Sequence, residues 1–278
     1  MSYLTTGNQY LTVNQQDIAY RELSKGKSDL PLVMLVHLAA TMDNWDPKLI
    51  DLLAAEQHVI LLDLPGVGAS QGKVAKTIPG MAEQAIDIIK ALGYEKINLL
   101  GLSMGGMVAQ EVVRAQADLV NRLILVGTGP RAGLGIDQVT KTTFNYMFKA
   151  GLEGVDPKRF IFYNHDEEGK RDAEEVLNRL TSRSKAYADK DMAVPSFLQQ
   201  LRAIKRWGKA EADDLAFISQ PTLIVNGDKD MMVATENSYD MHRKIANSQL
   251  IIYPNAGHGS LFQYADQFAK DLLDFLAD

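Results

Sequence analysis

The feature that most constrains the fold is a series of five short, continuous apolar segments separated by amphipathic ones. The apolar segments are rich in Val, Ile and Leu and cover residues 31–37, 58–63, 96–101, 122–127 and 221–227. Such segments are typical of strands buried on both faces of a sheet. The amphipathic segments repeat apolar residues three and four positions apart, as helices do, and cover residues 46–56, 78–93 and 104–116. This alternation predicts a mostly parallel sheet with helices on both faces.

The two ends of the chain extend this pattern. Residues 10–23 contain two alternating runs around a turn-like stretch at Asn14 to Asp17, which predicts an antiparallel hairpin at the start of the sheet. After residue 227 we expect a helix near 233–246, a strand in "QLIIYP" and a last helix from Ser260. The sheet is therefore predicted to have eight strands.

The alternation stops between residues 131 and 213. This segment is helical in pattern, with aromatic patches ("FNYMF", "RFIFY") and a charged stretch ("HDEEGKRDAEE"). It is too long to be a structureless connection between two strands, because such loops rarely exceed about 15 residues. We predict a helical lid at 131–213, inserted into a core formed by 1–130 and 214–278.

Composition and charge limit the partners and the chemistry that this chain can have. The 278 residues carry a net charge of −6 and no Lys/Arg block, which disfavours nucleic acid and anionic membranes as partners. The absence of cysteine excludes disulfides and cysteine nucleophiles. The polar start is unlike a signal peptide, and no apolar run approaches the roughly 18 residues of a membrane helix. We therefore expect a cytoplasmic protein without membrane association.

The clearest chemical motif is Gly101-Leu102-Ser103-Met104-Gly105, a G-x-S-x-G between a predicted strand and a predicted helix. This context is typical of a nucleophile elbow, a sharp turn that exposes the serine above the sheet. A Cβ at either glycine would collide with neighbouring backbone. The helix N-terminus would offer N–H groups to a developing negative charge. The alternative is that Ser103 only caps the helix.

A serine nucleophile requires a base and an acid that orients it. Among five histidines, His258 in "PNAGHGS" follows a predicted strand and precedes the last helix, so its ring can project over the sheet edge. His37 is expected to brace its loop. The turn "NGDKDMMV" offers Asp228 and Asp230, of which Asp230 is favoured as the acid; at least one of the two is expected to be a turn residue.

The chain order Ser103, Asp230, His258 is that of the α/β-hydrolases. The chain resembles this superfamily over nearly its whole length, in the elbow, the "GDKD" turn, the "AGHG" loop, the "DLPGVGAS" turn and the position of the lid. The resemblance implies an α/β-hydrolase fold with a serine nucleophile, in the esterase and cofactor-free haloperoxidase branch. It also implies that the fourth residue of the "GDKD" turn, Asp230, is the acid.

One stretch departs from the family pattern. Members usually have His-Gly-x after the third strand of the sheet, and this chain has "VHLAATMDNW", with Leu38 in the place of glycine. Carried over by position, the oxyanion donors are the N–H groups of Ala39 and Met104. We then expect Leu38 to adopt ordinary backbone angles. A donor through another residue, such as Leu38 itself, stays open.

These residues predict a serine hydrolase that cleaves a small or medium ester, thioester or lactone through an acyl-serine. Perhydrolysis, acyl transfer and carbon–carbon bond hydrolysis use the same triad, and a receptor-like homologue would bind ligand without turnover. The lid residues Phe144, Met147, Phe148 and Trp207 suit an apolar substrate, or else form the core of the lid. The sequence does not distinguish a monomer from a dimer.

Cofactor and metal motifs are not found. In "DLPGVGASQG", Gly66 and Gly68 lack a third glycine at the dinucleotide-binding spacing, because Gly72 is one residue too late. "GKS" at 26–28 lacks the earlier glycine of a P-loop. The histidines and carboxylates show no metal-binding spacing. We expect no cofactor and no metal, and a small-molecule acyl compound as the substrate.

Overall fold

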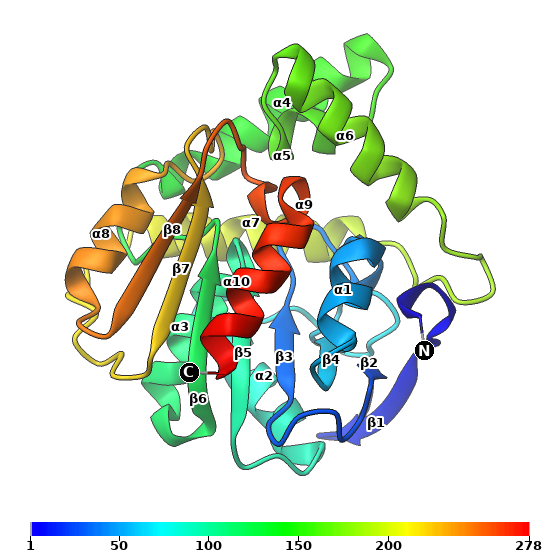
Figure 1. The fold of residues 1–278 in the computed structure, drawn as a ribbon, viewed down its shortest axis with the longest axis vertical. Coiled ribbons are helices and arrows are strands. Elements are labelled where there is room, and N and C mark those ends of the chain that lie inside the picture. The colour runs from blue at the N-terminus through cyan, green and yellow to red at the C-terminus, as the bar shows by residue number, and fades with distance from the viewer. Residues whose placement is uncertain (1, 278) are drawn as a thin grey trace.

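A single eight-stranded sheet forms the centre of the molecule, in a computed structural model that describes residues 2–277 (Figure 1). Across the sheet the strands are β1 (Gln9–Val13), β2 (Gln16–Leu23), β4 (Val59–Leu62), β3 (Leu32–Leu35), β5 (Ile97–Leu102), β6 (Val120–Val126), β7 (Thr222–Gly227) and β8 (Ser248–Tyr253). The pairs β1/β2 and β2/β4 are antiparallel, and all other neighbours are parallel. The predicted eight-stranded, mostly parallel sheet is confirmed.

The predicted hairpin begins the sheet. β1 and β2 are joined by Asn14 and Gln15, whose φ angles of 50° and 65° are both positive. A two-residue turn with two positive φ angles matches the twist of the flanking strands. The hairpin therefore forms where the turn-like stretch predicted it.

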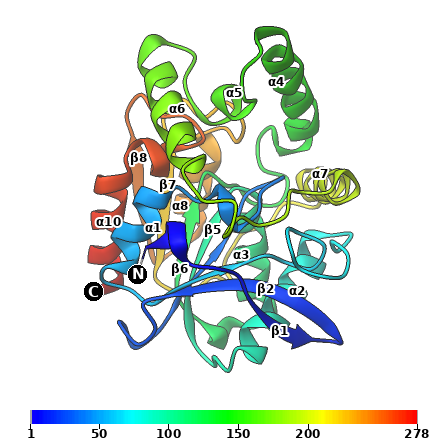
Figure 2. The ribbon, with the colours of Figure 1, turned by 90° about the vertical axis from the view of Figure 1, so that its right-hand side faces the viewer.

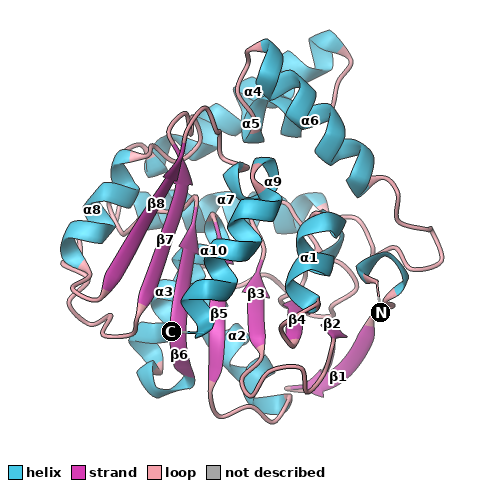
Figure 3. Cartoon of the chain, in the orientation of Figure 1, coloured by secondary structure: helices cyan, strands magenta, loops and turns pink. Residues whose placement is uncertain are grey.

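Helices cover both faces of the sheet, as Figure 3 shows. They are α1 (Pro47–Ala54), α2 (Ile78–Ala91), α3 (Met104–Ala115), α8 (Glu236–Lys244), α9 (Ser260–Gln263) and α10 (Ala265–Ala277). Successive strand residues point to opposite faces. In β3, Val33 and Leu35 pack in the apolar cluster that contains α2 and α3, whereas Met34 packs with α1 and α10. This two-sided burial explains why the strands read as continuous apolar runs.

The segment from 131 to 213 connects β6 to β7 and is entirely helical or irregular. It contains α4 (Val139–Glu153), α5 (Lys158–Phe162), α6 (Glu167–Leu180) and α7 (Val194–Gly208). Figures 1 and 2 show α4, α5 and α6 standing beyond the carboxyl ends of the strands, away from the sheet. The expected absence of a sheet strand between 131 and 213 agrees with this arrangement.

The last helix of the segment, α7, packs differently from the other three. Its residues Ala203, Ile204 and Trp207 are buried in the apolar cluster that contains α2 and α3. Trp207 also donates its Nε1–H to the carbonyl oxygen of Gly129, at 3.2 Å. α7 is thus attached to the sheet domain by both apolar packing and a buried hydrogen bond. The division into a core and a lid stays a prediction.

The C-terminal segment forms two helices where we predicted one. α9 ends at Gln263, and Tyr264 leaves the helical conformation with φ −107° and ψ 38°. The Tyr264 hydroxyl donates to the carbonyl oxygen of Pro254 at 2.8 Å, and its ring stacks on Tyr253 at 4.7 Å. These contacts hold Tyr264 against the end of β8 and interrupt the helix. No helix within residues 2–277 is long and apolar enough to span a membrane.

Candidate active site

Ser103 lies in the sharp turn between β5 and α3, in a backbone conformation that side chains rarely adopt. Its φ is 55° and its ψ is −116°, which costs about 1–3 kcal/mol for a residue other than glycine. Its N–H donates to Val126 O at 2.8 Å, and its carbonyl accepts from Thr128 Oγ1 at 2.7 Å. Its side chain makes no hydrogen bond that caps α3. Val126 at the end of β6 and Thr128 just after it hold the strained turn, and Ser103 occupies the N-cap position of α3 without capping the helix through its side chain.

The two glycines of the motif allow this turn, as predicted. A Cβ on Gly101 would meet the carbonyl oxygen of Gly105 at the start of α3. A Cβ on Gly105 would meet the carbonyl oxygen of Leu35 at the end of β3. Both obstacles are backbone atoms, which cannot move aside as a flexible side chain can. The helix therefore approaches the two strands only because these positions are glycine.

His258 joins Ser103 to Asp230 through two hydrogen bonds. Its Nε2 lies 2.9 Å from Ser103 Oγ, and its Nδ1 lies 2.8 Å from Asp230 Oδ2. A carboxylate can only accept, so Nδ1 carries the proton and Nε2 is free to accept from the serine hydroxyl. All three residues are buried. The loops after β5, β7 and β8 thus bring together the three residues that the sequence singled out.

The structure distinguishes the two aspartates of the "GDKD" turn. Asp230 Oδ1 accepts from the N–H groups of Met232 and Val233, at 2.8 and 2.9 Å, which leaves Oδ2 facing His258. Asp228 is exposed, and its side chain accepts from Ala256 N at 3.3 Å. Both aspartates bind turn backbone, and only Asp230 also reaches the histidine.

The other four histidines have different partners. His37 contacts the carbonyl oxygen of Leu38, and His58 contacts Glu22. His165 contacts the carbonyl oxygen of Phe160, and His242 contacts Ser248. His37 is the one of these four that lines the same cavity as Ser103. Burial lowers the pKa of His37 to about 3, so its ring is neutral at pH 7. Its Nδ1 donates to Leu38 O at 2.8 Å, consistent with the bracing role expected from the sequence.

The predicted oxyanion donors differ in their surroundings. Met104 is the first residue of α3, and its N–H has no acceptor among the described atoms. The N–H of Ala39 instead donates to Oε1 of Gln200 on α7, at 2.9 Å. The prediction that Ala39 supplies a free donor is therefore corrected, because its N–H is already hydrogen-bonded. Ala39 has a φ of 60°.

Leu38 adopts ordinary backbone angles, as we expected for a residue in the place of glycine. It is not among the residues with positive φ, whereas the next residue, Ala39, is. Leu38 lines the cavity beside Ser103, and no described atom accepts its N–H. The left-handed conformation occurs at Ala39, one residue after the position where family members have glycine.

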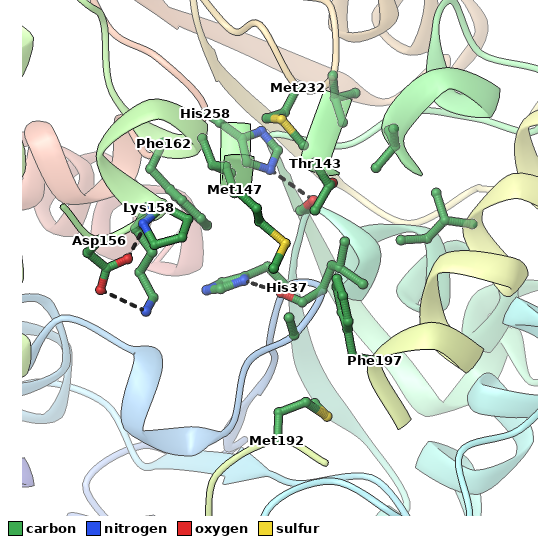
Figure 4. Close-up of a pocket in the computed structure, with 18 of the residues that line it drawn as sticks. His37, Thr143, Met147, Asp156, Lys158, Phe162, Met192, Phe197, Met232 and His258 are labelled. Carbon is green, nitrogen blue, oxygen red and sulfur yellow. Dashed lines mark hydrogen bonds and ion pairs between the residues drawn. The ribbon is translucent and has the colours of Figure 1, made fainter. Parts of the chain in front are cut away.

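A cavity of about 380 Å³ opens above Ser103 and His258. Its walls are mainly apolar, and Figure 4 shows Met147, Met192 and Phe197 around it. Asp156 and Lys158 bring charge to the lining and form an ion pair with a separation of 3.6 Å. Such a mainly apolar pocket with a few polar groups is typical of small-molecule sites.

The four lid residues noted in the sequence have different positions. Met147 lines the cavity. Trp207 is buried in the apolar cluster that contains α2 and α3. Phe148 is 70% exposed, and Phe144 is half-exposed with its ring against Phe197. Only one of the four therefore contributes directly to the cavity.

Sequence reasoning missed Gln200 and Lys158. Gln200 is buried on the same side of α7 as the apolar residues Phe197, Leu201 and Ile204. A polar residue within an apolar helical stripe was the available signal, because a buried amide needs a partner. Lys158 gave no signal, since charged residues are common throughout the segment.

Comparisons with known proteins place this fold and site in a family. A family model described as "alpha/beta hydrolase fold" matches residues 31–264. The chain belongs to this family. The "Alpha/beta hydrolase fold protein from Chitinophaga pinensis" is 31% identical in sequence, with a TM-score of 0.93 and coverage of 99% of both chains.

Two curated relatives have more specific names. The "Putative non-heme chloroperoxidase" of Synechocystis sp. is 26% identical over 276 residues, covering 96% of this chain and 99% of the relative. The "2-hydroxy-6-oxo-6-(2'-aminophenyl)hexa-2,4-dienoic acid hydrolase" of Metapseudomonas resinovorans is 27% identical over 275 residues, covering 95% and 90%. The curated relatives of this chain thus include a protein named as a chloroperoxidase and one named as a hydrolase.

Within residues 2–277, no group of three or more His, Cys, Asp or Glu side chains is arranged to hold a metal ion. The carboxylate beside the cavity, Asp156, is paired with Lys158.

Proposed function

We propose that this protein is a serine hydrolase that cleaves a small or medium ester, thioester or lactone. The observation that carries the proposal is the continuous hydrogen-bonded chain from Ser103 through His258 to Asp230 at a mainly apolar cavity. A serine hydroxyl aligned with a neutral imidazole, itself oriented by a carboxylate, is arranged for nucleophilic attack on an acyl carbon.

In the proposed mechanism, Ser103 Oγ attacks the acyl carbon while His258 Nε2 takes the hydroxyl proton. The carbonyl oxygen becomes an oxyanion, and the N–H of Met104 at the start of α3 is placed beside the nucleophile to stabilise it. Asp230 stabilises the imidazolium through Nδ1. The tetrahedral intermediate collapses, His258 protonates the leaving group, and an acyl-serine remains.

Hydrolysis of the acyl-serine completes the cycle. A water molecule attacks the acyl carbon, and His258 again acts as the base. Its proton returns to Ser103 when the second tetrahedral intermediate collapses. The buried position of all three side chains keeps their hydrogen bonds strong, because competing water is excluded.

The segment 131–213 serves as the lid in this proposal. It contributes Met147, Lys158 and Phe197 to the wall that faces the serine. An apolar acyl or alcohol group would pack against the methionine and phenylalanine side chains, with its reacting carbonyl at Ser103. The expected partner is a small-molecule acyl compound.

The names of the relatives favour two variants of the same chemistry. Carbon–carbon bond hydrolysis is favoured by the dienoic acid hydrolase relative, and perhydrolysis by the chloroperoxidase relative. Acyl transfer to an acceptor other than water would use the same acyl-serine. The three reactions differ in the nucleophile or leaving group and share Ser103.

A different class of function is favoured by the bond between Ala39 and Gln200. A receptor-like homologue would keep the cavity and bind a ligand without turnover. It would not need the N–H of Ala39 as an oxyanion donor, and here that N–H is engaged. Saturable ligand binding without Ser103-dependent chemistry would support this candidate over the hydrolase.

The deciding experiment compares the wild type with Ser103→Ala on p-nitrophenyl acetate. We expect the variant to lose about 10⁶ in kcat, because only binding and the oxyanion donors remain. A fluorophosphonate probe should add its mass to the Ser103 peptide of the wild type and leave the variant unlabelled. The exposed residue Ser182 provides a matched control, and Ser182→Ala should retain full activity.

Several outcomes would count against the hydrolase. Pure Ser103→Ala that keeps more than a few per cent of wild-type activity would exclude Ser103 as the nucleophile. A wild type that neither turns over esters, thioesters and lactones of varied length nor reacts with the probe would favour the binding protein. Circular dichroism and thermal unfolding establish that the variant is folded.

A further inference from the structure

The peptide unit between Leu38 and Ala39 is held at both ends by side chains. Its carbonyl oxygen, on Leu38, accepts from His37 Nδ1 at 2.8 Å. Its N–H, on Ala39, donates to Gln200 Oε1 at 2.9 Å. Rotation of this peptide would break both hydrogen bonds. The loop after β3 is therefore fixed beside Ser103 at a point where the backbone is in a left-handed conformation.

From this arrangement we infer that Gln200 is a positioning residue of the oxyanion hole, an inference that rests on the proposed serine-hydrolase function. Gln200 holds the N–H of Ala39, so the loop's donor to the oxyanion is the N–H of Leu38. Leu38 lines the cavity with Ser103, and its N–H has no acceptor among the described atoms. Met104 supplies the second donor.

The burial of Gln200 supports this role. Its side chain is 2% exposed, on a stretch of α7 whose neighbours Phe197 and Ile204 face the cavity. Burying an amide among apolar side chains is unfavourable unless it is hydrogen-bonded. The hydrogen bond to Ala39 satisfies its oxygen. An apolar residue at position 200 would fill the same space and leave the N–H of Ala39 without this acceptor.

Gln200 also connects two parts of the chain that meet at the cavity. α7 is anchored to the sheet domain through Trp207, whose Nε1–H donates to Gly129 O. The loop after β3 is braced internally by His37, whose Nδ1 donates to the neighbouring Leu38 O. Gln200 bridges the anchored helix and this braced loop, so the oxyanion loop and the wall formed by α7 keep a fixed separation. A preorganised donor stabilises developing charge without rearranging during the reaction.

The test compares Gln200→Met with the wild type. Methionine has a similar volume and cannot accept the N–H of Ala39 in the same way. We expect kcat for p-nitrophenyl acetate to fall by about 10–10², less than the 10²–10³ of a deleted donor, because the donor is displaced rather than removed. KM should stay within about threefold, because the cavity walls are unchanged. The neighbouring Gln199 does not line the cavity, and Gln199→Met serves as the matched control with unchanged kcat.

A second readout follows the contact without relying on catalysis. Amide exchange of Ala39, measured by NMR with ¹⁵N-alanine labelling, should accelerate at least about tenfold in Gln200→Met, since the amide loses its acceptor. Gln200→Glu keeps an accepting oxygen and should restore protection of the amide. Gln199→Met should leave it unchanged.

The outcomes separate this inference from the proposed function. Ser103-dependent turnover together with unchanged kcat and unchanged Ala39 exchange in Gln200→Met would overturn the positioning role alone. A phosphonate adduct of Ser103 whose oxygen binds the N–H of Ala39, with Gln200 displaced, would overturn the assignment of Leu38. A wild type without Ser103-dependent turnover would overturn both the hydrolase and the oxyanion role of Gln200.

Discussion

Two turns at the carboxyl ends of neighbouring strands face the same cavity, and different kinds of contact hold them in place. The turn after β5 carries Ser103, requires the close backbone approaches that Gly101 and Gly105 permit, and is hydrogen-bonded to Val126 and Thr128. The loop after β3 carries Leu38 and Ala39 and is held by side chains, one of them 161 residues away on α7. Both turns rest on tertiary contacts, but the first also requires a short local glycine motif, whereas the second depends on a side chain in a distant helix.

This difference determines what each turn reveals in the sequence. The elbow leaves a short pattern, because a Cβ at either glycine would strike backbone that cannot move. The loop after β3 leaves no comparable pattern. Its left-handed residue is Ala39 rather than a glycine, and the acceptor for its N–H lies in a distant helix. The conformation of the elbow is thus visible as a short motif. The conformation of the loop after β3 depends on a contact with a distant residue.

A large effect is expected at the triad beside the elbow. Asp230 Oδ1 accepts from two backbone N–H groups, so an asparagine at this position would keep its oxygen there. Its NH₂ group would then face His258 Nδ1 and force the proton onto Nε2. That tautomer cannot accept the Ser103 proton. We expect Asp230→Asn to lower kcat by about 10⁴.

Asp228→Asn is the matched control for this prediction. Asp228 is exposed in the same turn and does not contact His258, so the variant should stay within a few-fold of wild-type kcat. Steady-state rates with p-nitrophenyl acetate measure both effects. A more severe defect in Asp228→Asn than in Asp230→Asn would show that the acid has been assigned to the wrong residue.

A smaller effect is expected in the loop after β3, at Leu38→Gly. Leu38 has ordinary backbone angles, so glycine removes no strain there and adds freedom to the loop. The N–H of residue 38 is kept, and His37 and Gln200 still hold the following peptide. We expect kcat to fall by less than tenfold, against about 10²–10³ for a lost donor.

The same variant can contradict the comparison between the two turns. A gain of orders of magnitude in kcat would show that the wild-type loop is not preorganised for catalysis. A loss as large as that of a deleted donor would show that the Leu38 side chain, rather than distant contacts, fixes the loop. Amide exchange of Ala39 distinguishes a loosened loop from a local defect at residue 38.

Much of the fold follows from short patterns of apolar and turn-forming residues in the sequence. Apolar runs locate strands because strands buried on both faces have no polar side, and Val33 and Met34 show this on opposite faces of β3. The triad was predictable because each member lies in a short turn or loop that follows a strand. The break at Tyr264 and the bond between Ala39 and Gln200 were not, because each depends on a contact that only the folded chain creates.

Another tertiary contact supports the far end of the loop after β3. Asp63, directly after β4, is buried and accepts from Met42 N at 2.9 Å. Its Oδ2 lies beside Asp189 Oδ2, near Gly68, and no described atom donates to either oxygen. Burial and the neighbouring carboxyl of Asp189 raise the pKa of Asp63 well above its usual value, while Met42 N and Arg21 oppose the shift.

The smallest expected effect is therefore on stability, and it depends on pH. Because the folded state raises the pKa of Asp63, it binds the proton more tightly than the unfolded state. The free energy of unfolding then decreases as pH rises from the usual aspartate pKa of 3.8 toward the raised value.

Asparagine resembles the protonated carboxyl and can donate to Asp189, so Asp63→Asn should unfold at a higher temperature than the wild type at pH 8. A gain of about 1 kcal/mol corresponds to roughly 2–4 °C in a protein of this size. The difference should shrink at pH 5, and a variant less stable than the wild type by the same amount at both pH values would contradict a shared proton at this contact.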